Sequence, residues 1–118
     1  MAKVLVVDDS PLVRVILCDF LRDLGHEAIS AGTADEAISL CGAHHPDLVI
    51  KDLVMEDTDP CALMDDLRRI IPGLPIVICS TMGRRQEICA AIRAGATDFL
   101  VKPFGRDDVS SLMQHYTT

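Results

Sequence analysis

Long apolar runs are missing from this sequence. No stretch among its 118 residues approaches the roughly 20 apolar residues that are needed to cross a bilayer. The apolar stretch near the N-terminus stops at Asp8 and Asp9, so it lacks the length and the cleavage site of a signal peptide. Linkers, low-complexity tracts and internal repeats are absent as well. We therefore expect one compact domain over residues 1–118, cytoplasmic and without membrane contact.

Basic residues are scarce. The chain has 11 Lys and Arg against 18 Asp and Glu, which gives a net charge of -7. Because phosphate binding requires a basic surface, this balance argues against nucleic acid as a direct partner of the domain. The Gly-rich nucleotide-binding patterns G-x-G-x-x-G and G-x-x-x-x-G-K-[ST] do not occur either. Nucleotide binding is therefore discounted.

Metal-binding cysteine pairs are also missing. The five cysteines are an odd number, and none belongs to a C-x-x-C pair. Since they are scattered through apolar segments, we interpret them as small buried hydrophobic residues rather than disulfide partners or zinc ligands. The four histidines have no neighbouring ligand pattern and are expected in turns or at the surface.

The sequence does contain a regular alternation of strand and helix patterns. Helix starts are marked by Ser10-Pro11, by the capping box from Thr33 to Glu36 and by Asp59-Pro60. The predicted strands span residues 3–7, 27–30, 47–52, 75–80 and 98–101, and the predicted helices span about 11–24, 34–43, 60–71, 84–94 and 106–116. Five βα units predict an α/β fold, a parallel sheet with helices on both faces. The polar strand 27–30 is expected at its edge.

Helix-spaced apolar residues predict which side of each helix is buried. On the first helix these inward residues are Val13, Ile16, Leu17, Phe20, Leu21 and Leu24. On the fourth helix they are Ile88, Ala91 and Ile92.

The residues that leave the strands are the candidates for chemistry, because ligands of such sheets bind beyond the carboxyl ends of the strands. Two carboxylates roughly 4 Å apart repel by about 4 kcal/mol at an effective dielectric constant of about 20, so three of them require nearby positive charge. One lysine supplies part of that charge, and a divalent cation would supply the rest. The candidates are Asp8, Asp9, Asp52, Ser80 and Lys102.

Oxygen ligands without imidazole or thiolate favour Mg²⁺, Mn²⁺ or Ca²⁺ over zinc or copper. Carboxylates with room for water suit Mg²⁺ best, and the calcium-loop pattern D-x-D-x-D-G is missing. A cation, a carboxylate, a hydroxyl and a lysine together are typical of phosphoryl transfer, in which a carboxylate can act as the nucleophile. A single aspartate after a strand is more often a helix cap or a turn residue, so it is the joint placement that favours a site.

Four stretches in order carry a resemblance to a known family: VLVVDDSPLVR, PDLVIKDLVM, PIVICST and GATDFLVKPF. Over essentially its full length the chain resembles the CheY-like receiver domain of two-component response regulators. The resemblance implies a flavodoxin-like (βα)5 fold with strand order 2-1-3-4-5. It also implies a signalling domain that receives a phosphoryl group from a histidine kinase or a phosphotransfer protein, and not an enzyme with an external substrate.

The resemblance assigns the acidic positions. By position, Asp52 matches the phosphoacceptor, which also contacts Mg²⁺, and Asp8 and Asp9 match the other metal-binding acids. Val54 matches the residue whose backbone carbonyl completes the metal site.

The resemblance also implies a switch. Ser80 and Lys102 match the hydroxyl and the ammonium that contact the phosphoryl group, and Phe99 matches an aromatic residue that changes rotamer on activation. The expected consequence is a change in affinity for a downstream protein at the surface of the fourth helix, fifth strand and fifth helix. The Lys102-Pro103 peptide bond is cis in this family.

Several positions depart from the family pattern. Glu56 stands where Pro is usual, Pro60 stands where Gly is usual, and Thr81 replaces a customary Ala or Gly beside the site. Val54 and Met82 are apolar at the positions that set the lifetime of the acyl phosphate in the family. Since neither side chain can orient water, we expect slow hydrolysis.

Two other functions remain open at this point. One is a receiver-like interaction module that never accepts phosphate, and the other is a small Mg²⁺-dependent phosphohydrolase that uses Asp52 covalently. The hydrolase is disfavoured because no D-x-D acid/base pair accompanies Asp52. The sequence names neither kinase nor output partner, and it fits a separate regulator or a receiver from a longer protein. Lys51, which strand alternation points away from Asp52, has no assigned role.

Overall fold

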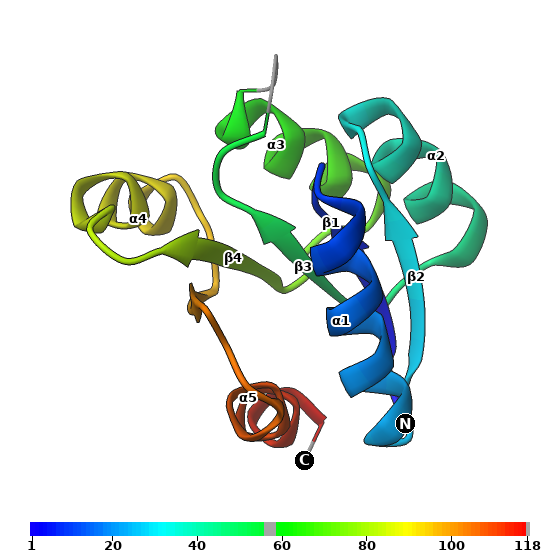
Figure 1. The fold of residues 1–118 in the computed structure, drawn as a ribbon. Helices are drawn as coiled ribbons and strands as arrows, with labels where there is room; N and C mark the ends of the chain where they lie inside the picture. The colour runs from blue at the N-terminus through cyan, green and yellow to red at the C-terminus, as the bar shows by residue number, and fades with distance from the viewer. Residues whose placement is uncertain (56–58, 118) are drawn as a thin grey trace.

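A five-stranded parallel sheet organises the molecule (Figure 1). The computed structural model describes residues 1–55 and 59–117. Along the chain the elements are β1 (Lys3–Val7), α1 (Pro11–Asp23), β2 (Glu27–Ala31), α2 (Ala34–His44), β3 (Leu48–Asp52), α3 (Pro60–Ile70), β4 (Ile76–Thr81), α4 (Arg85–Arg93), β5 (Asp98–Lys102) and α5 (Arg106–Thr117). The strand order is β2-β1-β3-β4-β5. The predicted fold is therefore confirmed, including the polar strand β2 at an edge.

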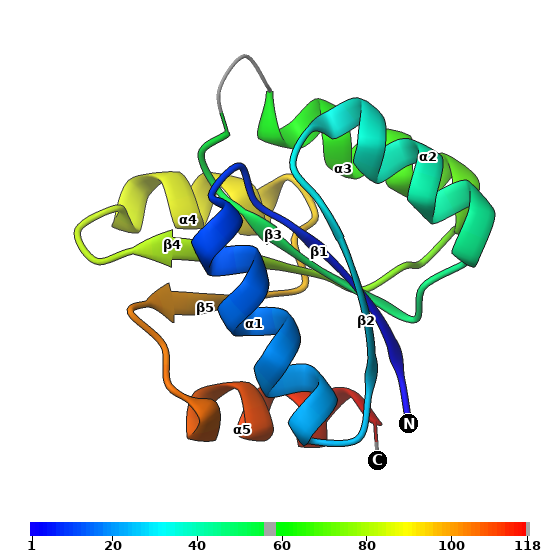
Figure 2. The same ribbon diagram turned by 45° about the vertical axis from the view of Figure 1, so that its right-hand side comes forward.

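Helices cover both faces of the sheet, as the two views of the ribbon show (Figures 1 and 2). Helices α1 and α5 pack on one face against Val4, Val6 and Ile50. Helices α2, α3 and α4 cover the other face, which presents Leu5 and Val49. Because β1, β3 and β4 are buried on both faces, their sequences are continuous apolar runs rather than alternating ones.

The helix starts follow the predicted capping chemistry. Ser10 Oγ accepts a hydrogen bond from Val13 N at 3.3 Å, and Thr33 Oγ1 accepts one from Glu36 N at 3.2 Å. In a capping box the glutamate side chain would accept a hydrogen bond from the main-chain N–H of the N-cap residue, here Thr33. Glu36 Oε1 instead accepts one from Gly32 N, the residue before the N-cap, at 3.0 Å. Within residues 1–55 and 59–117, no helix has the length and apolarity to span a membrane.

Some predictions of burial are wrong. Ile16 and Ile92 are 38% and 39% exposed, although helical spacing placed both on inward faces. Each helix turns only part of a wide apolar stripe toward the sheet, and the buried side chains of α1 are Leu17, Cys18 and Leu21. Cys61 and Cys89 are exposed, unlike Cys18, Cys41 and Cys79. All five cysteines are free thiols.

Candidate functional site

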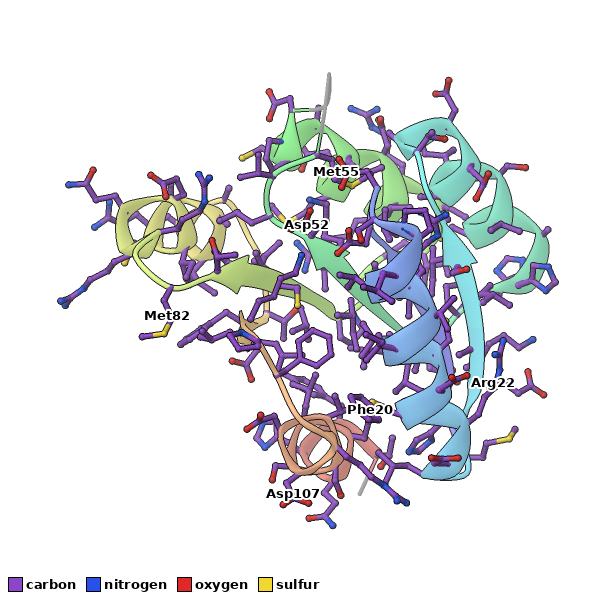
Figure 3. The ribbon with its side chains drawn as sticks, viewed as in Figure 1. Phe20, Arg22, Asp52, Met55, Met82 and Asp107 are labelled. Carbon is purple, nitrogen blue, oxygen red and sulfur yellow. The ribbon has the colours of Figure 1, made fainter. Side chains whose placement is uncertain are left out.

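Three carboxylates meet where β1 and β3 end. Strand β1 pairs with β3 in parallel, with Val7 opposite Lys51, so the next residues, Asp8 and Asp52, lie side by side at this edge of the sheet. One carboxylate oxygen from each of Asp8, Asp9 and Asp52 lies within 4.8 Å of the others. Asp8 is buried, Asp52 is half-buried and Asp9 is exposed, which gives the cluster one open side. Figure 3 shows Asp52 at the carboxyl end of β3.

Lys102, at the end of the edge strand β5, joins two of these acids. Its Nζ lies 3.0 Å from Asp8 Oδ2 and 3.2 Å from Asp52 Oδ1. Burial alone would lower the pKa of Lys102, but the hydrogen bond to Asp8 and the charges of both acids more than offset this effect and raise it. The ammonium group is therefore held in its charged form between the two carboxylates.

The pKa of Asp52 is raised. Burial is the largest cause, followed by the charge of Asp8, while Lys102 acts in the opposite direction. The protein thus disfavours the ionised form of Asp52 in the absence of a further positive charge. Such a perturbed carboxyl beside a lysine is typical of a functional site.

The cluster opens into a small polar cavity of about 210 Å³. Ser80 is buried, and its hydroxyl donates a hydrogen bond to the carbonyl of Thr81 at 3.0 Å. The resting hydroxyl is thereby turned toward its own chain. The cavity is lined by Asp52, Leu53, Val54, Ser80, Thr81, Arg84 and Lys102.

Arg84 is a lining residue that sequence reasoning missed. In the sequence, Arg84 only marked the predicted beginning of the fourth helix. In the structure it is the N-cap residue of α4, and its side chain forms no capping hydrogen bond. This basic residue lines a cavity that is also lined by Lys102. The signal available in the sequence was its position four residues after Ser80 in the segment that leaves β4.

Asp8 is held by the N-cap residue and the first turn of α1. Ser10 N donates to Asp8 Oδ1 at 2.9 Å, and Arg14 Nη1 donates to the Asp8 main-chain oxygen at 2.6 Å. Gly32 leaves room for this arginine, because a Cβ at that position would lie 2.9 Å from Arg14 Nη1. The acid is thus fixed in position by main-chain and side-chain donors, as a preorganised metal ligand would be.

The donor set of this cluster fits Mg²⁺. Three carboxylate oxygens within 4.8 Å, one of them on an exposed residue, offer hard ligands and leave space for water. Val54 lines the same cavity as Asp52 and is half-exposed, which is compatible with the predicted use of its carbonyl.

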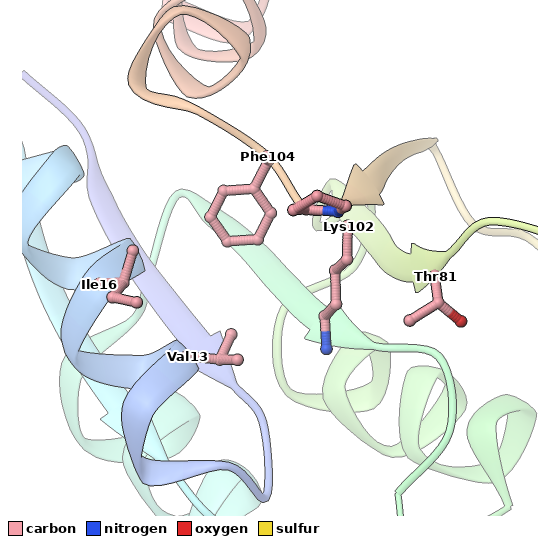
Figure 4. A pocket seen from close by; sticks show the side chains of 6 residues that line it. Val13, Ile16, Thr81, Lys102 and Phe104 are labelled. Atoms are coloured by element: carbon pink, nitrogen blue, oxygen red, sulfur yellow. The ribbon is translucent and has the colours of Figure 1, made fainter.

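A second, apolar cavity lies beside the acidic cluster (Figure 4). It measures about 280 Å³ and lies between α1 and the segment that follows β5. Figure 4 shows the extended Lys102 side chain with Val13 and Ile16 on one side and Thr81 on the other. Thr81 and Lys102 line both cavities, so the apolar surface is continuous with the polar one. The predicted cis peptide bond between Lys102 and Pro103 is present.

Phe99 lies apart from the acidic cluster. It pairs with Ile78 across β4 and β5, and its side chain is 47% exposed. It faces a surface cavity of about 440 Å³ together with residues of α4. The principal apolar members of this lining are Met82, Ile88, Cys89, Phe99 and Val101.

The segment after β3 is only partly described. Asp59 Oδ1 accepts hydrogen bonds from Cys61 N at 2.9 Å and Ala62 N at 3.5 Å, which confirms it as the cap before Pro60. Pro60 occupies the first position of α3, where its missing N–H is harmless. Glu56, the other departure in this segment, lies outside the described residues.

Comparison with known proteins identifies the family. Residues 4–114 match the model of the response regulator receiver domain. The chain is 35% identical over 108 residues to the chemotaxis protein CheY of Bacillus subtilis, covering 91% of this chain and 90% of that protein. It is also 35% identical to CheY of Thermotoga maritima over 103 residues, which are 86% of each chain.

Solved structures agree with the sequence matches. The receiver domain of NtrX from Brucella abortus superposes with a TM-score of 0.90 at 34% identity, covering 98% of this chain and 99% of that one. Against longer NtrX of the same organism the TM-score is 0.92 at 35% identity, and the chain spans only 27% of that protein. With this fold and this arrangement of strand-end residues, the chain belongs to the response regulator receiver domain family of two-component systems.

Proposed function

We propose that this chain is a phosphorylation-activated switch that accepts a phosphoryl group on Asp52 in a Mg²⁺-dependent reaction. The observation that carries the proposal is the cluster of Asp8, Asp9 and Asp52, in which Lys102 bridges two of the acids at 3.0 and 3.2 Å. Family membership supports the general role, since receiver domains are signalling domains rather than classical enzymes. The residue assignments are our proposal.

The proposed transfer begins from a phosphohistidine on a histidine kinase or a phosphotransfer protein. A carboxylate oxygen of Asp52 attacks phosphorus, the P–N bond of the donor breaks, and the leaving imidazole keeps the electron pair and takes up a proton. Asp8, Asp9, Asp52 and the carbonyl of Val54 would hold Mg²⁺, which supplies positive charge against the phosphoryl oxygens when it is bound. Lys102 Nζ already lies 3.2 Å from Asp52 Oδ1 and would neutralise further charge there.

The proposed response uses Ser80 and Phe99. A phosphoryl group on Asp52 offers new acceptors to the Ser80 hydroxyl, which would exchange its bond to the Thr81 carbonyl for one to phosphate. Phe99 would then turn inward from its exposed position. The two arrangements differ at α4, β5 and α5, so a downstream protein that prefers one of them responds to phosphorylation.

We treat residues 1–118 as a single receiver unit that signals by protein contact. Its coverage of the compared proteins, 90% of Bacillus CheY and 27% of Brucella NtrX, fits both a separate regulator and one part of a longer protein.

One experiment tests the proposal. The protein is incubated with a small acyl phosphate, with and without Mg²⁺, and its intact mass is measured. We expect a gain of one phosphoryl group that requires Mg²⁺ and is lost in Asp52→Asn, while the exposed Asp19→Asn serves as the matched control. No gain from the small donor or from any kinase would favour an interaction module. Many turnovers of an external phosphate ester would favour a hydrolase.

A further inference from the structure

Lys51 is a buried cation directly behind the acidic cluster. It precedes Asp52 in β3 and has no exposed surface. Strand alternation places its side chain on the face opposite to Asp52, with Val49, in the core that α2 and α3 cover. Its Nζ turns back to the end of the strand and donates to the Asp52 main-chain oxygen at 2.7 Å.

Lys51 interacts with residues at both described ends of the segment between β3 and α3. Burial lowers the pKa of Lys51 to about 8, and the negative charges of Asp52 and Asp59 partly offset that effect. Asp52 begins this segment, and Asp59 caps the helix at its end. The ammonium group is therefore bonded to one end and within electrostatic range of the other.

The residues that directly follow Asp52 alternate in burial. Leu53 and Met55 are 2% and 5% exposed, while Val54 between them is 50% exposed. Leu53 N also donates to the Cys79 oxygen at 2.8 Å and so continues the sheet by one residue. The position of the Val54 carbonyl therefore depends on how the main chain leaves Asp52, which is the point that Lys51 holds.

A purely structural role explains Lys51 poorly. Desolvating an ammonium group is costly, and replacement of buried ionic groups by apolar side chains of similar volume is often neutral or stabilising. The neighbours of Lys51 on this face, such as Val49 and Ile78, are apolar and would accept methionine. The charge and the hydrogen bond, rather than the volume, distinguish lysine at this position.

We infer that Lys51 is a positioning residue, whose ammonium group fixes the Asp52 main chain and thereby the approach of the Val54 carbonyl to the cation held by the acidic cluster. This inference rests on the proposed function, because it assigns Lys51 a part in assembling that same site. Lys51 touches neither the donor nor the reacting carboxylate, and it acts through the main chain.

The test is a calorimetric titration with Mg²⁺ alone, which needs no phosphoryl donor. For Lys51→Met we expect Mg²⁺ affinity to fall by about tenfold, the lower end of what loss of an outer-shell partner causes. The direction of the change in Mg²⁺ affinity is informative, since removal of a positive charge by itself would tighten binding of a cation. Unchanged or tighter binding would overturn the inference. Lys3→Met is the matched control, because Lys3 Nζ donates to the His44 carbonyl at 3.3 Å, away from the acidic cluster.

A second variant separates the hydrogen bond from the charge. Lys51→Gln retains a donor without the charge, so we expect its Mg²⁺ affinity to lie closer to that of the wild type than to that of Lys51→Met, for which the expected loss is about tenfold. This variant also carries the test if Lys51→Met does not fold, and an affinity as low as that expected for Met would then overturn the role of the bond. Phosphorylation by a small acyl phosphate is measured in parallel. A wild type that binds Mg²⁺ but never gains mass would refute the proposed function without refuting the position of Lys51.

Discussion

Lys102 Nζ lies 3.0 Å from Asp8 Oδ2, although 94 positions separate the two residues in the sequence. The same nitrogen lies 3.2 Å from Asp52 Oδ1, so one ammonium group joins residues at the ends of β1, β3 and β5. β5 is an edge strand and is not a neighbour of either of the other two. The long lysine side chain thus spans β4 and provides the positive charge that the clustered acids require.

The first prediction concerns this bridge. In Lys102→Met, two carboxylates lose their shared cation, and we expect the free energy of unfolding without metal to fall by about 2 kcal/mol. This is less than for a fully buried pair, because the Lys102 side chain is 17% exposed. Urea unfolding followed by circular dichroism measures the change. Added Mg²⁺ should restore more stability in the variant than in the wild type, since the cation replaces the missing charge.

Lys3→Met is the control for that measurement. Lys3 forms an exposed pair with Glu27 at 3.9 Å, and such pairs contribute about 0.5 kcal/mol or less. Equal losses of stability in the two variants would show that Lys102 contributes no more than a surface ion pair.

The second prediction is a pH dependence at Asp52. Its pKa is raised by burial and then by the charge of Asp8, so the stability that this carboxyl contributes is present below its ordinary pKa and is lost as the pH rises through the folded-state value. Asn imitates the neutral carboxyl. Without metal, Asp52→Asn should exceed the wild type in unfolding free energy by an amount that grows as the pH rises above the ordinary pKa of an aspartate. A difference independent of pH would contradict the assignment, and exposed Asp19→Asn is the control.

The third prediction concerns the lifetime of the acyl phosphate. Val54 lines the cavity of Asp52 and is 50% exposed, and its side chain cannot orient water. We expect slow loss of phosphate from the purified protein. Val54→Asn should hasten that loss by about tenfold, below the effect of a true general base because an amide only orients water. Val15→Asn, at another exposed valine, should leave the rate unchanged, and rapid loss from the wild type would refute the expectation.

Much of the site was predictable because parallel strands end at one edge. Asp8, Asp52 and Lys102 each follow or end an apolar strand, so the topology alone brings them together once the strand order is known. Side-chain position within that edge was less predictable. The sequence could place Lys51 on the face opposite to Asp52, yet it could not show that the long side chain returns to the Asp52 carbonyl.

Exposure was also hard to predict from spacing. Ile16 on α1 fits the helical apolar pattern, but it lies at the border of the stripe and faces the apolar cavity beside Lys102. Phe99 belongs to a strand with apolar neighbours, yet its face of β5 is open because this strand is at the sheet edge. The period of a helix or strand predicts which way a side chain points. Whether that side chain is buried depends on whether another element packs against that side.

The fourth prediction compares two glycines. Gly95 has a φ of +117°, and a Cβ there would lie 2.8 Å from Arg68 Nη1. Arg68 is held by its bond from Nε to the Leu74 oxygen at 3.1 Å, so it cannot yield freely. Gly95→Ala should therefore lower the free energy of unfolding by about 1–2 kcal/mol. Gly42→Ala should raise it by roughly 0.5–1 kcal/mol, because Gly42 lies inside α2 with nothing within 4 Å of its Cβ position. If both variants changed the free energy of unfolding in the same direction, this explanation would be contradicted.

The fifth prediction uses the single tyrosine. Burial raises the pKa of Tyr116 to about 12, and its hydroxyl donates to Asp98 Oδ2 at 3.1 Å, which adds to the effect. The chain has one Tyr and no Trp, so tyrosinate absorbance in the ultraviolet reports this residue alone. Asp98→Asn should move the midpoint toward the ordinary value of about 10. Exposed Asp107→Asn should leave it unchanged.

The same bond has a defined effect on stability. Because the folded-state pKa of Tyr116 is raised to about 12, the contribution of the neutral phenol is complete below its ordinary pKa and is lost as the pH rises through about 12. The bond joins the beginning of β5 to the last turn of α5, so its loss should loosen that helix first. Amide exchange measured at high pH should therefore increase in α5 before it increases in β1 or β3. Simultaneous exchange throughout the sheet would instead mean that Tyr116 ionises only on global unfolding.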